Sequence, residues 1–255
     1  MTIDFQTTLI PLATLILLGW LVGRTQDIDL KSVTTILIYA ISPVVAFLST
    51  AQMHFKDIFV FLPGVTLILS ATCDLSTFVI GRYCLKKKEL GYLLPIAAGS
   101  GNNGYFGLPL AMAVFAPERV GIYFLVTLGV TFFEATLGYF FVARGHLSAA
   151  EALQRAIRIP VTYAIVAGLI LSSLHLNLDP GLLKLYDAAR GCYVSLGMMI
   201  IGMALAKHKR LAWDMDFLAL SMFGKYGLWA LFTTAFIWAD THLLKAYDAD
   251  IHKMI

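Results

Sequence analysis

The sequence carries little charge. Asp, Glu, Lys and Arg make up only 14% of its 255 residues, whereas 59% of the residues are hydrophobic. Soluble domains carry about a quarter charged residues, so this composition predicts a polytopic membrane protein. The apolar stretches also lack the alternation of polar and apolar residues that is typical of outer-membrane barrel strands. The predicted fold class is therefore an all-α polytopic membrane protein.

The sequence also lacks the residue sets that catalysis or metal binding needs. Its three cysteines are scattered, and its six histidines fall at the ends of apolar windows or in loops, without metal-ligand spacing. Gly99–Gly101 resembles the nucleophile loop of an intramembrane serine protease, but no histidine lies inside another window to act as its base. The HExxH motif of zinc proteases is absent as well. We therefore expect no enzyme activity, no metal, no cofactor and no nucleic-acid partner.

Apolar windows long enough to cross about 30 Å of hydrocarbon recur along the chain. The first window has neither a basic flank nor a small-residue cleavage site, so it is predicted to be a retained helix and not a signal peptide. The sequence predicts eight spans: residues 6–23, 31–51, 57–81, 90–115, 120–142, 159–176, 183–206 and 214–239.

Positive charge is divided unevenly between the loops. Twelve Lys and Arg residues follow spans one, three, five and seven, against five in the other loops and after the last span. By the positive-inside rule, this predicts a multi-pass protein of the cell (inner or plasma) membrane with its N-terminus outside. The twelve are Arg24, Lys31, Arg82, Lys86, Lys87, Lys88, Arg144, Arg155, Arg158, Lys207, Lys209 and Arg210; the five are Lys56, Arg119, Lys184, Lys245 and Lys253.

Two groups of residues recur at a common spacing. Pro11 and Gly19 of span one are repeated 149 residues later in span six, and Asp29 before span two is repeated 150 residues later before span seven. Because five spans is an odd number, the second copy is predicted to insert inverted, as in many secondary transporters. Residues 1–145 then form the first five-helix repeat, and residues 146–255 form a second repeat with only three spans. By this logic the chain is truncated after eight of ten spans.

The fourth span, residues 90–115, has the polar centre GSGNNG. Its glycines weaken a helix, and Pro95 and Pro109 bracket them. Unwound backbone is tolerated at bilayer depth only where protein or a water-filled cavity satisfies its N–H and C=O groups. Asn102 and Asn103 bring amide donors and acceptors to such a gap. The sequence therefore predicts a broken crossover helix that binds substrate. Its candidate binding residues are Gly101, Asn102, Asn103, Gly104, Tyr105 and Pro109.

A close helix–helix crossing through small residues is the alternative interpretation of this segment. It accounts for the glycines. It does not account for two adjacent asparagines between two prolines, so the broken helix is favoured.

The motif GNNGYFGLPLAM resembles the fourth helix of the auxin efflux carrier family. Asn102, Gly104, Gly107 and Pro109 match the asparagine-glycine-proline pattern of that helix, whereas Asn103 stands where the family often has Ser or Thr. The stretches LIYAISPVVAF in span two and VSLGMMIIGMAL in span seven are also similar to family helices. The resemblance implies a ten-span inverted-repeat fold with two crossed broken helices, a scaffold and a transport domain. The short loop between spans five and six resembles the bacterial branch, whose members are permeases for small carboxylates such as malate or malonate. Plant members export auxin, and related carriers often dimerise.

Three charged residues lie deep inside predicted spans and are candidates for ion coupling or charge pairing. Asp74 lies about eight residues, or roughly 12 Å, inside Arg82, too deep for its short side chain to reach water. A role in binding or protonation is therefore the default, with a structural hydrogen bond as the alternative. Lys225 lies 151 residues after Asp74. Three roles stay open for it: to neutralise Asp74, to attract an anionic substrate, or to extend to the membrane interface. For Glu134, structural pairing and function both stay open, and Arg190 faces either an outer vestibule or the headgroups.

The leading functional hypothesis is a secondary transporter that moves a small organic anion by alternating access. Its expected partners are a dicarboxylate or auxin-like carboxylate, a coupling proton or sodium ion, the lipid bilayer and a second copy of the chain. One alternative is a cation-coupled carrier of the bile-acid or sodium–proton exchanger type. Another is a truncated remnant that does not transport.

Overall fold

A computed structural model describes residues 5–53, 56–87, 90–99, 101–138, 160–174, 178–207 and 214–255. These residues form helices and no strand, so the predicted all-α fold is confirmed. Among the described residues, three helical stretches are long and apolar enough to cross a membrane: Leu30–Gln52, Asp57–Cys84 and Pro180–Lys207. Leu9–Thr25 and Pro160–Ser173 are shorter apolar helices.

The predicted orientation, the count of eight spans, the truncation and the inverted repeat stay predictions. Six of the twelve cationic residues behind the orientation lie outside the described residues, namely Lys88, Arg144, Arg155, Arg158, Lys209 and Arg210.

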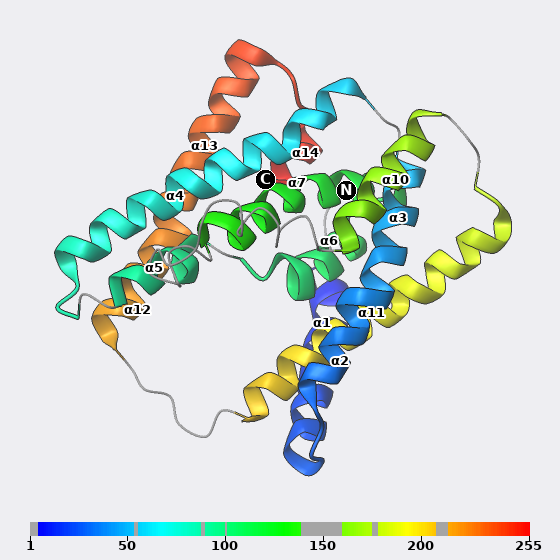
Figure 1. Cartoon of the computed structure of the whole chain (residues 1–255), viewed down its shortest axis with the longest axis horizontal. Helices are drawn as coiled ribbons and strands as arrows, with labels where there is room; N and C mark the ends of the chain where they lie inside the picture. Colours follow the sequence, from blue (N-terminus) through cyan, green and yellow to red (C-terminus); the bar gives the residue numbers. More distant parts are fainter. Residues whose placement is uncertain are drawn as a thin grey trace. The chain divides into compact units, whose positions relative to one another are not determined.

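Short π-helical turns interrupt or extend several of the α-helices; only η2 among the η segments is a 3-10 helix. The described helices run in this order (Figure 1): α1 (Phe5–Thr25), α2 (Leu30–Ile36), η1 (Leu37–Ile41), α3 (Ser42–Gln52), η2 (Asp57–Phe61), α4 (Leu62–Cys84), α5 (Leu90–Gly99), η3 (Asn103–Gly107), α6 (Leu108–Val114), α7 (Pro117–Phe133), η4 (Glu134–Gly138), α10 (Pro160–Ser173), α11 (Pro180–Lys207), α12 (Met215–Met222), η5 (Phe223–Leu228), α13 (Trp229–Ala239), η6 (Asp240–Leu244) and α14 (Ala249–Met254).

Local sequence sets several of the helix starts. Asp29, Asp214 and Asp248 are N-caps, and their carboxylates accept backbone N–H groups from the first turns of α2, α12 and α14. Pro43 and Pro109 come two residues after the π-turns η1 and η3, which continue directly into α3 and α6, so the missing N–H of each proline interrupts the hydrogen-bond ladder beside a π-turn.

Helix packing divides the chain into two compact units. Unit 1 comprises Met1–Phe55, Asn102–Phe124 and Pro160–Leu211; unit 2 comprises Lys56–Gly101, Leu125–Ile159 and Ala212–Ile255. Each unit contains residues from before and after position 145, so the units do not coincide with the two predicted repeats. A sequence repeat does not need a core of its own, so this division leaves the repeat untested.

Two helix pairs in unit 1 pack closely through glycine. Helix α1 lies along α11, and α10 lies along α3. A methyl group at Gly19 of α1 would overlap the backbone carbonyl of Met199 in α11, and one at Gly168 of α10 would overlap Thr50 in α3. Such close backbone approach increases van der Waals contact, on which helix association in lipid depends.

Unit 2 is centred on α4 and α5, which pack against each other (Figure 1). Helix α4 also contacts α13 and η5, and α5 also contacts α12 and η5. The Sγ atom of Cys73 in α4 lies 3.7 Å from the carbonyl oxygen of Gly224 in η5. A methyl group at Gly224 would come within 2.5 Å of the Ala98 side chain of α5. This tight contact of three elements positions the neighbouring Asp74.

Candidate functional site

The predicted break in the fourth span is visible as a gap between helices. Helix α5 ends at Gly99, and helical structure resumes with η3 at Asn103. Between them, Gly101 and Asn102 have no regular secondary structure and are exposed, while Ser100 lies outside the described residues. The chain passes from unit 2 to unit 1 between Gly101 and Asn102. The interruption therefore lies at the glycines and asparagines that predict it.

Asn102 closes the first turn after the gap. Its Oδ1 atom accepts the backbone N–H of Tyr105 at 3.1 Å. Its carbonyl oxygen accepts the N–H groups of Phe106 and Gly107 at 3.1 and 2.9 Å. Asn102 thus acts as the N-cap of η3, which satisfies backbone donors that the gap would otherwise leave unpaired. This structural role comes in addition to the predicted ligand contact.

Two tyrosines from other helices hold the carbonyl groups of η3. Tyr123 of α7 donates its hydroxyl to the carbonyl oxygen of Asn103, and Tyr193 of α11 donates to that of Gly104, each at 3.3 Å. Both tyrosines are buried. An unwound turn whose backbone groups are paired in this way can be accommodated at bilayer depth. Neither tyrosine belongs to a motif that predicts this contact, although a tyrosine inside an apolar helix indicates that its hydroxyl needs a partner.

The side chain of Asn103 has no such structural role. It is half-buried and, within the described ranges, forms no hydrogen bond. Its amide therefore retains two donors and an acceptor for a ligand. Tyr105 beside it is half-buried, and Gly104 is exposed, so a polar atom can approach the backbone there. Pro109 is buried in the first turn of α6 and shapes the helix start instead.

Asp74 of α4 lies in unit 2 and is fully buried. Both of its carboxylate oxygens, and the hydroxyl of Ser70 one turn earlier, lack a hydrogen-bond partner among the described residues. The carboxylate lies against the last residue of α5, where a methyl group at Gly99 would overlap Oδ1. The last turn of a helix presents carbonyl oxygens and partial negative charge, so α5 offers this carboxylate no donor. A buried carboxylate in this position needs a proton or a cation to offset its charge.

Glu134 and Lys225 are the other two charged candidates, and both lie in unit 2. Glu134 begins η4 and lies close enough to Asp74 for the two carboxylates to repel each other. Lys225 lies in η5 and is half-buried; in the part of the chain that the structure describes, its ammonium forms no ion pair with Asp74 or another acid. Both residues occur in π-helical segments, which are frequent at functional sites. The structure brings Asp74 and Glu134 together, and a charge pair between Asp74 and Lys225 stays a prediction.

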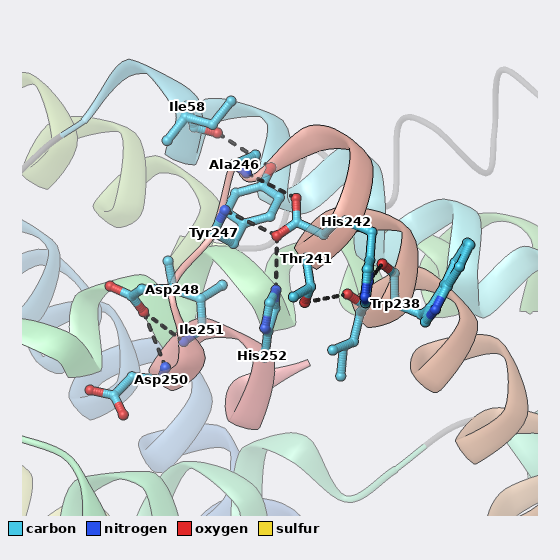
Figure 2. A network of polar contacts seen from close by, with 12 residues as sticks. Ile58, Trp238, Thr241, His242, Ala246, Tyr247, Asp248, Asp250, Ile251 and His252 are labelled. Atoms are coloured by element: carbon cyan, nitrogen blue, oxygen red, sulfur yellow. Dashed lines mark hydrogen bonds and ion pairs between the residues drawn. The ribbon is translucent and has the colours of Figure 1, made fainter.

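A second buried acid, Asp240, follows α13 and is surrounded by donors. Figure 2 labels the three residues that supply them, Ala246, Tyr247 and His252. Its Oδ1 accepts the N–H of Ala246 at 3.1 Å, and its Oδ2 accepts that of Tyr247 at 3.1 Å. Nε2 of His252 in α14 lies 2.9 Å from Oδ2. Burial raises the pKa of the Asp240 carboxyl, but the hydrogen bonds from His252, Ala246 and Tyr247 outweigh burial and hold the pKa below its usual value. No spacing pattern in the sequence predicts this cluster.

No protein-family model matches the chain, and no match was found among the curated proteins. No group of three or more His, Cys, Asp or Glu residues is placed to hold a metal ion in the residues that the structure describes. Two places in the structure point to function, the turn Asn103–Gly107 in unit 1 and the buried Asp74 in unit 2.

Proposed function

We propose that the protein is a secondary transporter resembling the auxin efflux carriers. It moves a small organic anion, such as a dicarboxylate or an auxin-like carboxylate, across the cell membrane by alternating access. The observation that carries this proposal is the turn at Asn103–Gly107. Its carbonyl groups are held by tyrosine hydroxyls, while the Asn103 amide has no partner within the described ranges. A polar gap in an apolar chain is expected where a substrate binds.

Helix contacts in unit 1 support the inverted repeat on which this proposal draws. Gly19 approaches Met199, and Gly168 approaches Thr50. Adding the repeat offset of 149 to Gly19 gives position 168, and adding it to Thr50 gives position 199. The repeat therefore relates the contact between Gly19 and Met199 to the contact between Gly168 and Thr50. Reciprocal contacts of this kind are expected for two halves related by a two-fold axis.

A contact in unit 2 supports the same relation. Cys73 touches Gly224, and the two are 151 residues apart, close to the offset of the other matches. Residues that a two-fold axis relates to each other touch only near that axis. In the proposed repeat, Asp74 and Lys225 therefore lie beside the axis, where secondary transporters bind their substrates and ions.

A specific observation favours a coupling ion. Asp74 and Ser70 have buried oxygen atoms on one face of α4, and these atoms lack a hydrogen-bond partner among the described residues. Buried polar atoms without protein partners are expected to hold water, a proton or a small cation. We propose that Asp74 binds a proton or sodium ion during transport. A cation-coupled carrier of the bile-acid or sodium–proton exchanger type, the second candidate, would share this property.

Uptake by the purified protein in liposomes tests the proposal, with radiolabelled malonate, malate and indole-3-acetate as probes. Asn103→Ala is expected to raise the KM for the transported anion about five- to a hundredfold, because one hydrogen bond in a water-poor site is lost. The midpoint of thermal unfolding should stay unchanged, since no protein contact of this amide is lost among the described residues. Gln52→Ala is the matched control, because the Gln52 amide already donates to the carbonyl of Leu48 at 2.9 Å.

An unchanged KM in Asn103→Ala would contradict the assignment of this turn as the substrate site. Sodium or proton flux without uptake of any of the three anions would favour the cation exchanger instead.

Asn102 allows capping to be separated from ligand binding. Asn102→Ala removes both the cap and the amide, so stability should fall by about 1 kcal/mol. Asn102→Ser retains an oxygen that can cap η3 and should keep most of that stability. If Asn102 also binds the anion, the KM rises in both variants; a KM that rises only in Asn102→Ala assigns Asn102 to capping alone.

A further inference from the structure

Arg190 is a cation inside the predicted seventh span that has no acid partner among the described residues. It lies seven residues, or about 10 Å of helix, beyond residue 183, where that span is predicted to begin. The side chain is half-buried, and its guanidinium donates a hydrogen bond to the carbonyl oxygen of Met112 in α6. No described acid forms an ion pair with Arg190, and this includes Asp187, three residues earlier on α11. An intramembrane charge without a counter-charge points to function.

The same face of α11 also holds the turn after the break. Tyr193, three residues after Arg190 and thus on the same helix face, donates to the carbonyl of Gly104. Met112 follows Gly107 by five residues, or about 7.5 Å of helix. Arg190 and Tyr193 therefore contact the two ends of the continuous segment from η3 to α6. The guanidinium is held on the side of α11 that faces the proposed substrate site in unit 1.

A hydrogen bond to one carbonyl oxygen leaves most of the N–H donors of an arginine available. The guanidinium has five N–H groups in a planar fork, and the contact with Met112 engages one of its nitrogens. The free edge of such a fork matches the two oxygens of a carboxylate. The bond to Met112 fixes the plane of the fork and so reduces the ordering needed when an anion binds.

We propose that Arg190 binds the carboxylate of the transported anion and so makes the site select acids over their neutral analogues. This inference rests on the proposed function. The competing explanation is that Arg190 only satisfies a carbonyl in the last turn of α6.

Two substitutions at Arg190 separate these explanations. Arg190→Gln keeps an N–H donor for the Met112 carbonyl but removes the charge, and Arg190→Lys keeps the charge but removes the fork. Uptake of radiolabelled malonate and indole-3-acetate is measured in liposomes, with malonamide and indole-3-acetamide as unlabelled neutral competitors. Arg190→Gln is expected to raise the KM on the order of ten- to a hundredfold and to abolish the preference for acids over amides. Arg190→Lys should raise the KM less and retain the preference.

Thermal unfolding and the Asn103→Ala variant complete the test. Suppose that Arg190→Gln leaves the KM and the preference for acids unchanged, whereas Asn103→Ala raises the KM. That result overturns the role of Arg190 but leaves the proposed function standing. Absence of uptake of malonate, malate and indole-3-acetate by the unmodified protein overturns the proposed function and this inference with it. If Arg190→Gln does not fold, Arg190→Lys decides: an unchanged KM assigns Arg190 to the end of α6 alone.

Discussion

Asp74 and Asp240 are both fully buried aspartates in unit 2, but their surroundings are opposite. Asp240 has two backbone N–H donors and the ring of His252. Asp74 has no donor among the described residues, and Glu134 lies close enough to repel it. Burial of an acid therefore does not by itself identify a functional group. The donors around it decide whether its negative charge is part of the fold or must be offset by something that binds.

The difference has a local origin in the backbone. Asp240 begins η6, whose C-cap residue Lys245 has the left-handed conformation (φ 53°). The chain reverses there, so the N–H groups of Ala246 and Tyr247 are turned toward the Asp240 carboxylate. Asp74 lies inside α4, where the helix uses its own N–H groups, and it faces the carbonyl end of α5. An aspartate therefore stabilises a chain reversal at position 240, whereas at position 74 its carboxylate lies between two helices without a donor among the described residues.

The largest expected effect is a loss of stability in Asp240→Ala. The substitution leaves His252 and two N–H groups without their buried acceptor, so the free energy of unfolding should fall by about 3–5 kcal/mol. Thermal unfolding of the protein in detergent measures the change. Asp216→Ala is the matched control, because Asp216 lies in the same unit but is exposed. An Asp240→Ala variant as stable as the control would show that the cluster contributes little to the fold.

Acid should remove part of the same contribution. The pKa of the Asp240 carboxyl is lower in the folded than in the unfolded chain, so the unfolded chain binds the proton first as the pH falls. The stabilisation is therefore fully present above about pH 4 and is lost as the pH falls below it. The difference in unfolding midpoint between the unmodified protein and Asp240→Asn should shrink between pH 6 and pH 3, by no more than about 1.3 kcal/mol in equivalent free energy, because the unfolded carboxyl begins to bind its proton only near pH 4. A difference that stays constant or grows toward pH 3 would contradict this assignment.

Asp74→Asn should affect stability in the opposite direction. Removing an unpartnered charge beside Glu134 should leave the free energy of unfolding unchanged or raise it by up to about 1 kcal/mol. Uptake should lose its dependence on the proton or sodium gradient, while exchange of internal for external anion continues. Unfolding in detergent and counterflow in liposomes are the two measurements. A clear loss of stability would mean that the Asp74 carboxylate is anchored as Asp240 is.

The sequence predicts those features that depend on nearby residues. Composition predicts the all-α fold, and glycines with adjacent asparagines predict where the fourth span is interrupted. The membrane depth of Asp74, which depends on its distance to Arg82 along one helix, stays a prediction. In each case the prediction depends on helix propensity or on helix length, and both are set by residues within about twenty positions of each other.

Features that depend on packing could not be predicted in this way. Tyr123 and Tyr193 hold the carbonyl groups of η3 because α7 and α11 pack beside it, and no local pattern specifies that choice of neighbours. The closeness of Asp74 to Glu134, and the cluster of His252 with Asp240, likewise depend on contacts between separate elements. The pairing of Asp74 with Lys225 stays a prediction, since the repeat offset relates positions but does not specify side-chain contacts.

The smallest expected effect concerns the coupling between Asp74 and Lys225. If their charges were paired, Asp74→Asn would leave a half-buried ammonium alone, and adding Lys225→Met would restore stability. Because no ion pair joins them in the described residues, we expect the two substitutions to act independently. A double-mutant cycle of thermal stability should then give a coupling energy below about 0.5 kcal/mol, the limit within which independent sites add. Lys225→Met alone should change stability little, since the long side chain of a half-buried lysine can reach water without a partner.

A coupling energy above about 1 kcal/mol, with stability lost in Asp74→Asn and regained in the double variant, would establish the charge pair and remove Asp74 as a proton or sodium site. Asp240 with His252 provides the positive control within the same unit, because Asp240→Asn and His252→Gln remove two side chains in direct contact and should show strong coupling.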